Sequence, residues 1–141
     1  MRNKVQASLL VLTALFFAAL PALAHHSFAA EFDGQKTVTV TGVLTKVEWI
    51  NPHVRFHLDT KDENGNVVPW EIATWPTGLL HKAGLSRQLF VEGQTVTMFG
   101  YRAKDGSRLA YLGKVTFADG HQFILWSAGR VDPSDPSQKS Q

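Results

Sequence analysis

The chain contains no cysteine, and this absence restricts both its stabilisation and its chemistry. Without a thiol it can form no disulfide, no thiolate metal site and no cysteine nucleophile. It has only two methionines, and one of them is Met1, so a copper(I) site built from thioethers is disfavoured. The folded domain must therefore be stabilised by its hydrophobic core.

The sequence motifs of common enzymes are also missing. The chain has no G-x-S-x-G nucleophile elbow, no H-E-x-x-H zinc motif and no glycine-rich phosphate loop. Glu71 and His57 could act as an acid–base pair, but no residue beside them has the character of a nucleophile. We therefore predict a binding protein rather than an enzyme.

The first 24 residues have the three parts of a secretory signal. Arg2 and Lys4 supply the positive start, Ala7–Leu20 is almost wholly apolar, and Ala22-Leu23-Ala24 is a small-x-small cleavage site. The apolar run is shorter than the roughly 20 residues that span a membrane. We predict a signal peptide at residues 1–24 and a periplasmic or secreted protein without a membrane span after cleavage.

Cleavage after Ala24 changes the charge balance of the chain. Removing 24 residues from 141 leaves 117, and removing Arg2 and Lys4 lowers the basic residues from 14 to 12, against 12 acidic residues. A neutral exported protein lacks the electrostatic basis for binding nucleic acid, so we expect no such partner. We predict one domain at residues 25–129 and a disordered polar tail at residues 130–141.

Alternating apolar and polar residues predict an all-β domain. The expected strands are Thr37–Ile50, His53–Thr60, Val67–Trp75, Thr95–Ala103, Arg108–Phe117 and His121–Trp126. A short helix is expected within Pro76–Gly84, where Leu79, Leu80 and Ala83 form an apolar face. This order predicts a small OB-like antiparallel β-barrel of five to six strands, with one short helix between the third and fourth strands. Another small antiparallel barrel or sandwich is the alternative.

Two local details refine the prediction. The apolar positions of the first strand change from even to odd numbers around Gly42, which predicts a β-bulge there. In the next hairpin, a three-residue loop with Gly65 in the left-handed conformation keeps the apolar residues on one face. That register pairs Leu58 with Trp70, Phe56 with Ile72, His57 with Glu71 and His53 with Trp75.

Three segments resemble a family of exported bacterial proteins of unknown function. They are His25–Asp33, which begins His-His-Ser-Phe, Val47–His53, which contains Trp-Ile-Asn-Pro-His, and Gly100–Gly106. The resemblance extends from about His25 to Phe123. It implies a small, exported, all-β domain, but it supplies no activity and no site residues.

The histidines raise the question of a metal site. Cleavage after Ala24 would give His25 a free α-amine, which can chelate a metal together with an imidazole or with the His26 amide. Such nitrogen ligands suit Cu(II) or Ni(II), and imidazole also suits Zn(II). His53 and His57 lie four residues apart on one strand, about 13 Å, which is too far to share one ion. We predict a copper site with His25 as the principal ligand and His26 or His53 as the second ligand.

The alternative prediction is a metal-free binding module of the cell envelope, with a glycan, peptide or protein as its partner. Strands two and three form the usual binding face of OB folds. The residues expected to bind the ligand there and at the nearby mouth are Trp49, Asn51, Arg55, His57, Glu71 and Trp75. We expect His57 to contact Glu71 across the strands, and Trp49, His53 and Trp75 to gather at the mouth. His81 and His121 are expected to be surface residues.

Overall fold

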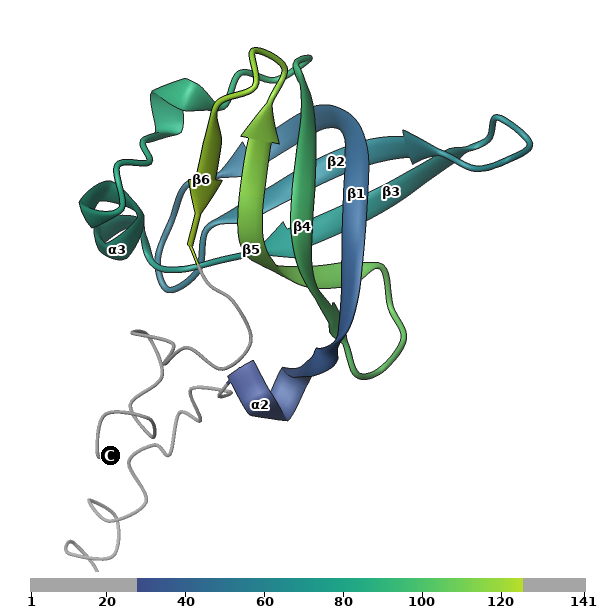
Figure 1. Cartoon of the computed structure of the whole chain (residues 1–141), viewed down its shortest axis with the longest axis horizontal. Coiled ribbons are helices and arrows are strands. Elements are labelled where there is room, and N and C mark those ends of the chain that lie inside the picture. The colour runs from purple at the N-terminus through teal and green to yellow at the C-terminus, as the bar shows by residue number, and fades with distance from the viewer. Residues whose placement is uncertain (1–27, 126–141) are drawn as a thin grey trace, which may run out of the picture.

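A computed structural model of the chain describes residues 28–125. Its elements, in order, are α2 (Phe28–Glu31), β1 (Phe32–Glu48), β2 (Arg55–Lys61), β3 (Val67–Ala73), α3 (Thr77–Lys82), the 3₁₀-helix η1 (Arg87–Leu89), β4 (Thr95–Ala103), β5 (Leu109–Phe117) and β6 (Gln122–Ile124). Strands β2 and β3 lie behind β4 and β5 in Figure 1, and their hairpin extends beyond the body of the domain. The predicted signal peptide and tail lie outside the described residues.

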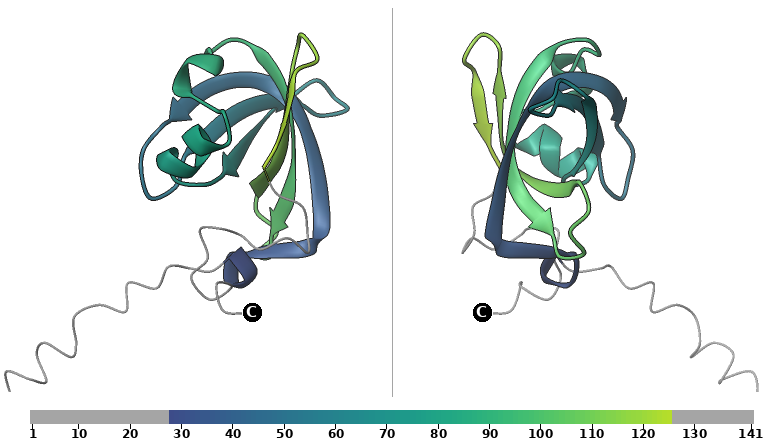
Figure 2. Two further views of the ribbon diagram at one scale, coloured as in Figure 1. Left: turned by 60° about the vertical axis from the view of Figure 1, so that its left-hand side comes forward. Right: turned by 90° about the vertical axis from the view of Figure 1, so that its right-hand side faces the viewer.

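The strands form one sheet in the order β3-β2-β1-β4-β5-β6, and β3 pairs with β5 as well. Every pairing is antiparallel except β3 with β5, which is parallel. The long strand β1 bends so that it pairs with β2 near its end and with β4 near its start (Figure 2). The prediction of an all-β, OB-like fold with a short helix between the third and fourth strands is confirmed. The parallel pairing was not predicted.

The bend of β1 contains a bulge, but the bulge is at Thr45 and not at Gly42. The register with β2 shifts between Leu44 and Lys46, so Thr45 is the additional residue. Leu44 is fully buried, whereas Val43 is 41% exposed, which is the reverse of the predicted orientation. Gly42 has no side chain, so the apolar pattern does not show which face of the strand this residue points to.

The β2–β3 hairpin has the predicted register. The pairs are Phe56 with Ile72, His57 with Glu71, and Leu58 with Trp70. Gly65 has a φ of 83°, and the amide of Gly65 donates a hydrogen bond to the carbonyl oxygen of Asp62. The Asp62 carboxylate accepts hydrogen bonds from Asn66, which lower its pKa. This loop therefore encloses three residues, as predicted from the apolar pattern.

The core lies between the curved strands and is closed by aromatic side chains. Phe56 and Phe90 are both fully buried, with ring centroids 4.4 Å apart. At the other end, Phe28 stacks on Phe32 at 5.6 Å and meets the edge of Tyr111 at 5.4 Å. Phe28 and Phe32 therefore pack the segment before the long strand onto the domain.

Helix α3 ends where it was predicted to end. Gly84 has a φ of 85°, a conformation that glycine adopts without steric cost. Leu80 is fully buried and Leu79 is half-buried, but Ala83 is exposed and does not belong to the apolar face. Within residues 28–125, no helix has the length and the apolar character needed to cross a membrane.

Candidate functional site

The outward face of strands β1, β2 and β3 carries a group of charged and titratable side chains. Lys46 pairs with His57, Glu48 with Arg55, and His57 with Glu71. Alternate residues of a strand point to opposite faces, and the intervening Phe56 and Leu58 are fully buried. We call the outward group the polar face; it comprises Lys46, Glu48, Arg55, His57 and Glu71.

The polar face is organised by ion pairs between neighbouring strands. Glu48 contacts the ammonium of Lys46, and its Oε1 lies 3.6 Å from Nε2 of His57. Arg55 Nη1 lies 3.1 Å from Oε1 of Glu71. The hydrogen bond from Lys46 is the largest influence that lowers the pKa of Glu48, and the charges of Lys46, His57 and Arg55 lower it further. Glu48 is therefore ionised at neutral pH.

The predicted contact between His57 and Glu71 needs a correction. The two residues are opposite each other, but the Glu71 carboxylate pairs with Arg55, and the acid beside the His57 imidazole is Glu48. Glu48 lies on β1, whose register with β2 is set by the bulge at Thr45. His57 Nε2 is buried and has no hydrogen bond among the described residues, because 3.6 Å is too long for one.

A hollow of about 430 Å³ opens beside the polar face. Its lining residues are Thr45, Lys46, His57, Leu58, Asp59, Pro69, Trp70, Glu71 and Arg108. Arg108 is exposed, and its guanidinium makes no ion pair or hydrogen bond within residues 28–125. The guanidinium of Arg102 lies 5.5 Å from the ring centroid of Trp70 and holds this aromatic side chain in place.

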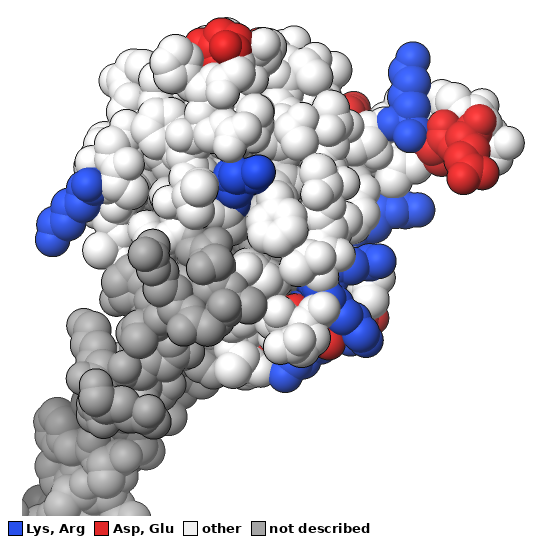
Figure 3. Space-filling view, viewed as in Figure 1, with Lys and Arg blue, Asp and Glu red and all other residues white. Residues whose placement is uncertain are grey.

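Figure 3 shows the side over β4, β5 and β6, where charged side chains are few.

The Asn51-Pro52 turn adjoins the start of helix α3. Its peptide bond is cis. Asn51 Oδ1 accepts hydrogen bonds from the amide and the hydroxyl of Thr77, at 3.1 and 3.0 Å. Asn51 was predicted to bind a ligand, but its side-chain oxygen is engaged in joining the turn to the helix.

His53 is held by the backbone of the strand beside it. Its Nδ1 lies 3.0 Å from the carbonyl oxygen of Thr74. A carbonyl oxygen can only accept a hydrogen bond, so Nδ1 of the neutral imidazole carries the proton and Nε2 carries the free lone pair. The backbone amide of Val54 bonds to Trp75, and that of Thr74 bonds to Val54. This irregular pairing anchors the imidazole just before the start of β2.

Trp75 does not present an exposed ring to the predicted aromatic mouth. Trp75 is only 8% exposed and belongs to the hydrophobic core. Trp49 is half-buried, and its ring lies 5.8 Å from that of His81 and 6.0 Å from that of Phe90. His81 is exposed as predicted, but it covers one side of Trp49. Trp75 lies between the end of β3 at Ala73 and the start of helix α3 at Thr77.

The predicted metal ligands His25 and His26 lie outside the described residues. Within residues 28–125, no group of three or more histidine, aspartate or glutamate side chains could hold a metal ion. Of the predicted metal ligands, the structure therefore locates His53 alone.

Sequence reasoning missed three residues of this region, namely Lys46, Glu48 and Arg108. Lys46 and Glu48 are two residues apart on a strand, and this spacing would have placed them on one face. Arg108 gave no such signal, because it follows the turn before β5 and meets β3 only through the β3–β5 pairing.

Comparisons with known proteins give a family but no curated relative. A model of a family of unknown function, DUF6152, matches residues 14–114. No curated protein matches the chain. Among solved structures, the mitochondrial single-stranded DNA binding protein Rim1 of S. cerevisiae aligns with a TM-score of 0.47 and 8% identity, over 62% of this chain and 94% of that one.

Two further solved structures are similar to this chain to a comparable degree. A selenomethionine-labelled crystal of Rim1 aligns with a TM-score of 0.45 and 7% identity, over 64% of this chain and 97% of that one. The ZRD-deleted mutant of TiaS in complex with agmatine aligns with a TM-score of 0.43 and 20% identity, over 69% of this chain and 23% of that one. These similarities are too distant to bear on the function of this chain.

Proposed function

We propose that this chain, which belongs to DUF6152, a family of unknown function, is an exported OB-like binding module. Its ligand would be a glycan or a peptide of the cell envelope, held on the polar face without a metal. The observation that supports this proposal best is the hollow beside the polar face, which combines charges of both signs with the half-buried ring of Trp70.

The charges of the polar face favour a ligand without a large net charge. Lys46 and Arg55 are balanced by Glu48 and Glu71. Among the lining residues of the hollow, the carboxylate of Asp59 offsets the charge of Arg108, whose guanidinium has no partner within residues 28–125. A phosphate polymer would require an excess of positive charge, which this face does not have. A glycan or a zwitterionic peptide fits better, because both present donors and acceptors.

Arg108 is the residue whose removal should affect such a ligand most. The N–H groups of its guanidinium are available to a ligand, and hydrogen bonds to a charged group contribute about 1.5–3 kcal/mol. Arg108→Ala is therefore expected to weaken binding by about 10-fold or more. The probes are chitotriose and the tripeptide Ala-Ala-Ala, titrated into ¹⁵N-labelled protein and followed by amide chemical shifts.

The control is Lys114→Ala, which removes one positive charge from β5 at a residue that does not line the hollow. This variant should bind the probe as the natural protein does. If neither probe shifts the amides of β1, β2 and β3, or if Lys114→Ala weakens binding as much as Arg108→Ala, the proposed module is wrong.

We propose a second function, copper binding by His25, His26 and His53, because of the geometry at His53. The carbonyl of Thr74 holds the proton on Nδ1 and leaves the Nε2 lone pair for a ligand. Metal-binding histidines commonly have this arrangement, with the other ring nitrogen bonded to a carbonyl or carboxylate. A free amine and imidazole at His25 would complete a nitrogen set that suits Cu(II).

Loss of an N-terminal ligand should reduce copper affinity strongly. His25→Ala is expected to lower Cu(II) affinity by at least about 100-fold, and His53→Ala by about 10- to 100-fold. Titration with spin-resonance detection measures both, after intact mass has located the mature N-terminus. His81→Ala is the matched control, because that imidazole is exposed on helix α3 and has no role in the proposed copper site. A mature chain that starts elsewhere, or unchanged binding in His25→Ala, would overturn this proposal.

A further inference from the structure

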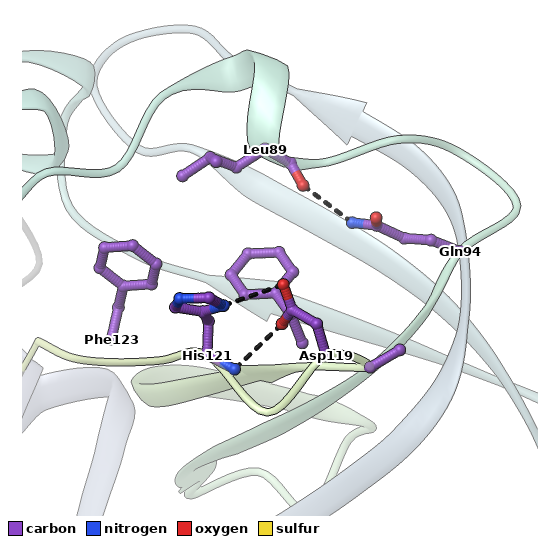
Figure 4. Close-up of a pocket in the computed structure, with 7 residues that line it drawn as sticks. Leu89, Gln94, Asp119, His121 and Phe123 are labelled. Atoms are coloured by element: carbon purple, nitrogen blue, oxygen red, sulfur yellow. Dashed lines mark hydrogen bonds and ion pairs between the residues drawn. The ribbon is translucent and has the colours of Figure 1, made fainter.

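A second hollow lies away from the polar face, between the β5–β6 turn and the segment around η1. Its volume is about 480 Å³. It is lined by Leu89, Gln94, Phe117, Ala118, Asp119, His121 and Phe123. Figure 4 shows the side chains of Asp119, His121 and Phe123 side by side along the turn, facing Leu89 and Gln94. Neither proposed function uses these residues.

Aromatic side chains form the apolar walls of this hollow. The rings of Phe117 and Phe123 are 6.1 Å apart and nearly perpendicular, at 86°. Phe117 also packs against the buried ring of Phe90 at 5.3 Å. This contact ties one wall to the hydrophobic core, so the wall has a defined position before any ligand arrives. Such walls suit a ligand with an apolar or aromatic body.

The polar group at the rim is an aspartate that is held in its ionised form. Asp119 Oδ1 accepts a hydrogen bond from the backbone amide of His121 at 3.0 Å, and Oδ2 lies 2.9 Å from Nδ1 of the same residue. The backbone bond and then the imidazole bond lower the pKa of Asp119. Because Nδ1 donates to the carboxylate, the neutral imidazole of His121 has its free lone pair on Nε2.

Gln94 adds a further acceptor to the same hollow. Its Nε2 donates to the carbonyl oxygen of Leu89 at 3.1 Å, and this contact orients the amide and leaves Oε1 without a described partner. The available polar atoms are therefore a carboxylate, an imidazole nitrogen and an amide oxygen, all of them acceptors. None of the seven lining residues is a lysine or an arginine. The ligand that matches this set is a donor with positive charge.

We propose that this hollow binds a small organic cation, an ammonium or guanidinium group on an apolar or aromatic body. The apolar body lies against Phe117 and Phe123, and the cationic group faces Asp119. The side chains of Asp119 and His121 are 64% and 79% exposed, so solvent and salt screen the attraction. The preference for a cation over its neutral analogue is therefore modest, about fivefold.

Three probes of the same size and different charge test this proposal. Benzylamine is a cation at pH 7, benzyl alcohol is neutral and benzoate is an anion. Titrated into ¹⁵N-labelled protein at low salt, benzylamine should bind about fivefold more tightly than benzyl alcohol, and benzoate should bind more weakly than both. The shifts should centre on residues 117–123, and 0.5 M sodium chloride should reduce the difference.

Asp119→Asn should remove the preference and keep the turn. The asparagine oxygen can still accept the hydrogen bond from the amide of His121, but the negative charge is lost. Asp105→Asn is the matched control, because Asp105 accepts the amide of Ser107 at 2.8 Å in a turn of the same kind, outside the hollow. It changes the net charge equally and should leave the preference intact.

Two outcomes would overturn the proposal. One is equal affinity of the natural protein for benzylamine and benzyl alcohol. The other is loss of the preference in Asp105→Asn as well as in Asp119→Asn, which would show a general charge effect. A capped Phe-Lys dipeptide separates the sources of the cation. If this dipeptide binds as benzylamine does, the side chain of a protein partner can also supply the cation.

Discussion

Phe56→Ala is expected to lower the free energy of unfolding by about 3–5 kcal/mol. The Phe56 side chain is fully buried, and its ring lies 4.4 Å from that of Phe90 at the centre of the core. Removing the ring loses the hydrophobic free energy of its burial. It also leaves a cavity that the curved sheet cannot close. Urea unfolding followed by tryptophan fluorescence measures the loss.

The neighbouring Arg55→Ala is the control for this prediction. The Arg55 side chain is 50% exposed and its ion pair with Glu71 is partly solvated, so its loss should cost less than about 1 kcal/mol. Phe56 and Arg55 thus test the two faces of one strand. A cost below about 1.5 kcal/mol for Phe56→Ala, at an unchanged denaturant slope, would mean that the core does not depend on this ring.

Gly100→Ala is expected to destabilise the protein by about 3 kcal/mol. A Cβ at this position would lie 2.5 Å from the carbonyl oxygen of Tyr111 and 3.1 Å from its carbonyl carbon. Both atoms belong to the backbone of β5, so relief requires β4 and β5 to move apart at the register shift between Phe99 and Gly100. Thermal and urea unfolding measure the effect.

The same substitution at Gly78 should have the opposite sign. Gly78 lies in helix α3 and has an ordinary backbone conformation, and a Cβ at this position would meet no atom within 4 Å. Alanine there is expected to stabilise the protein by about 0.5 kcal/mol, because it restricts the unfolded chain and favours the helix. Equal destabilisation by the two variants would contradict the proposed clash with Tyr111.

The local patterns of the sequence were sufficient for the hairpin and several element boundaries. The pairing of His57 with Glu71 followed from keeping Phe56 and Leu58 on the apolar face and from Gly65 in the loop. The bounds of β4 agree with the predicted Thr95–Ala103. These features depend on residues close together in the chain, where alternation and turn residues specify the structure directly.

The candidate sites depended on contacts that alternation does not encode. The partner of His57 is Glu48 because the bulge at Thr45 sets the register of β1 against β2. The sequence pattern placed that bulge at Gly42. A glycine has no side chain, so it does not show where the alternation of inward and outward residues changes.

The sequence by itself determined the class of fold, the hairpin register and the candidate histidines. Only the tertiary structure decided that Trp75 is part of the core and that Arg108 lies beside the polar face. It alone brought Asp119 and Phe123 opposite Gln94. The physical reason is that a strand specifies its own two faces, whereas neighbours from distant segments depend on how bulges and bends set one strand against another.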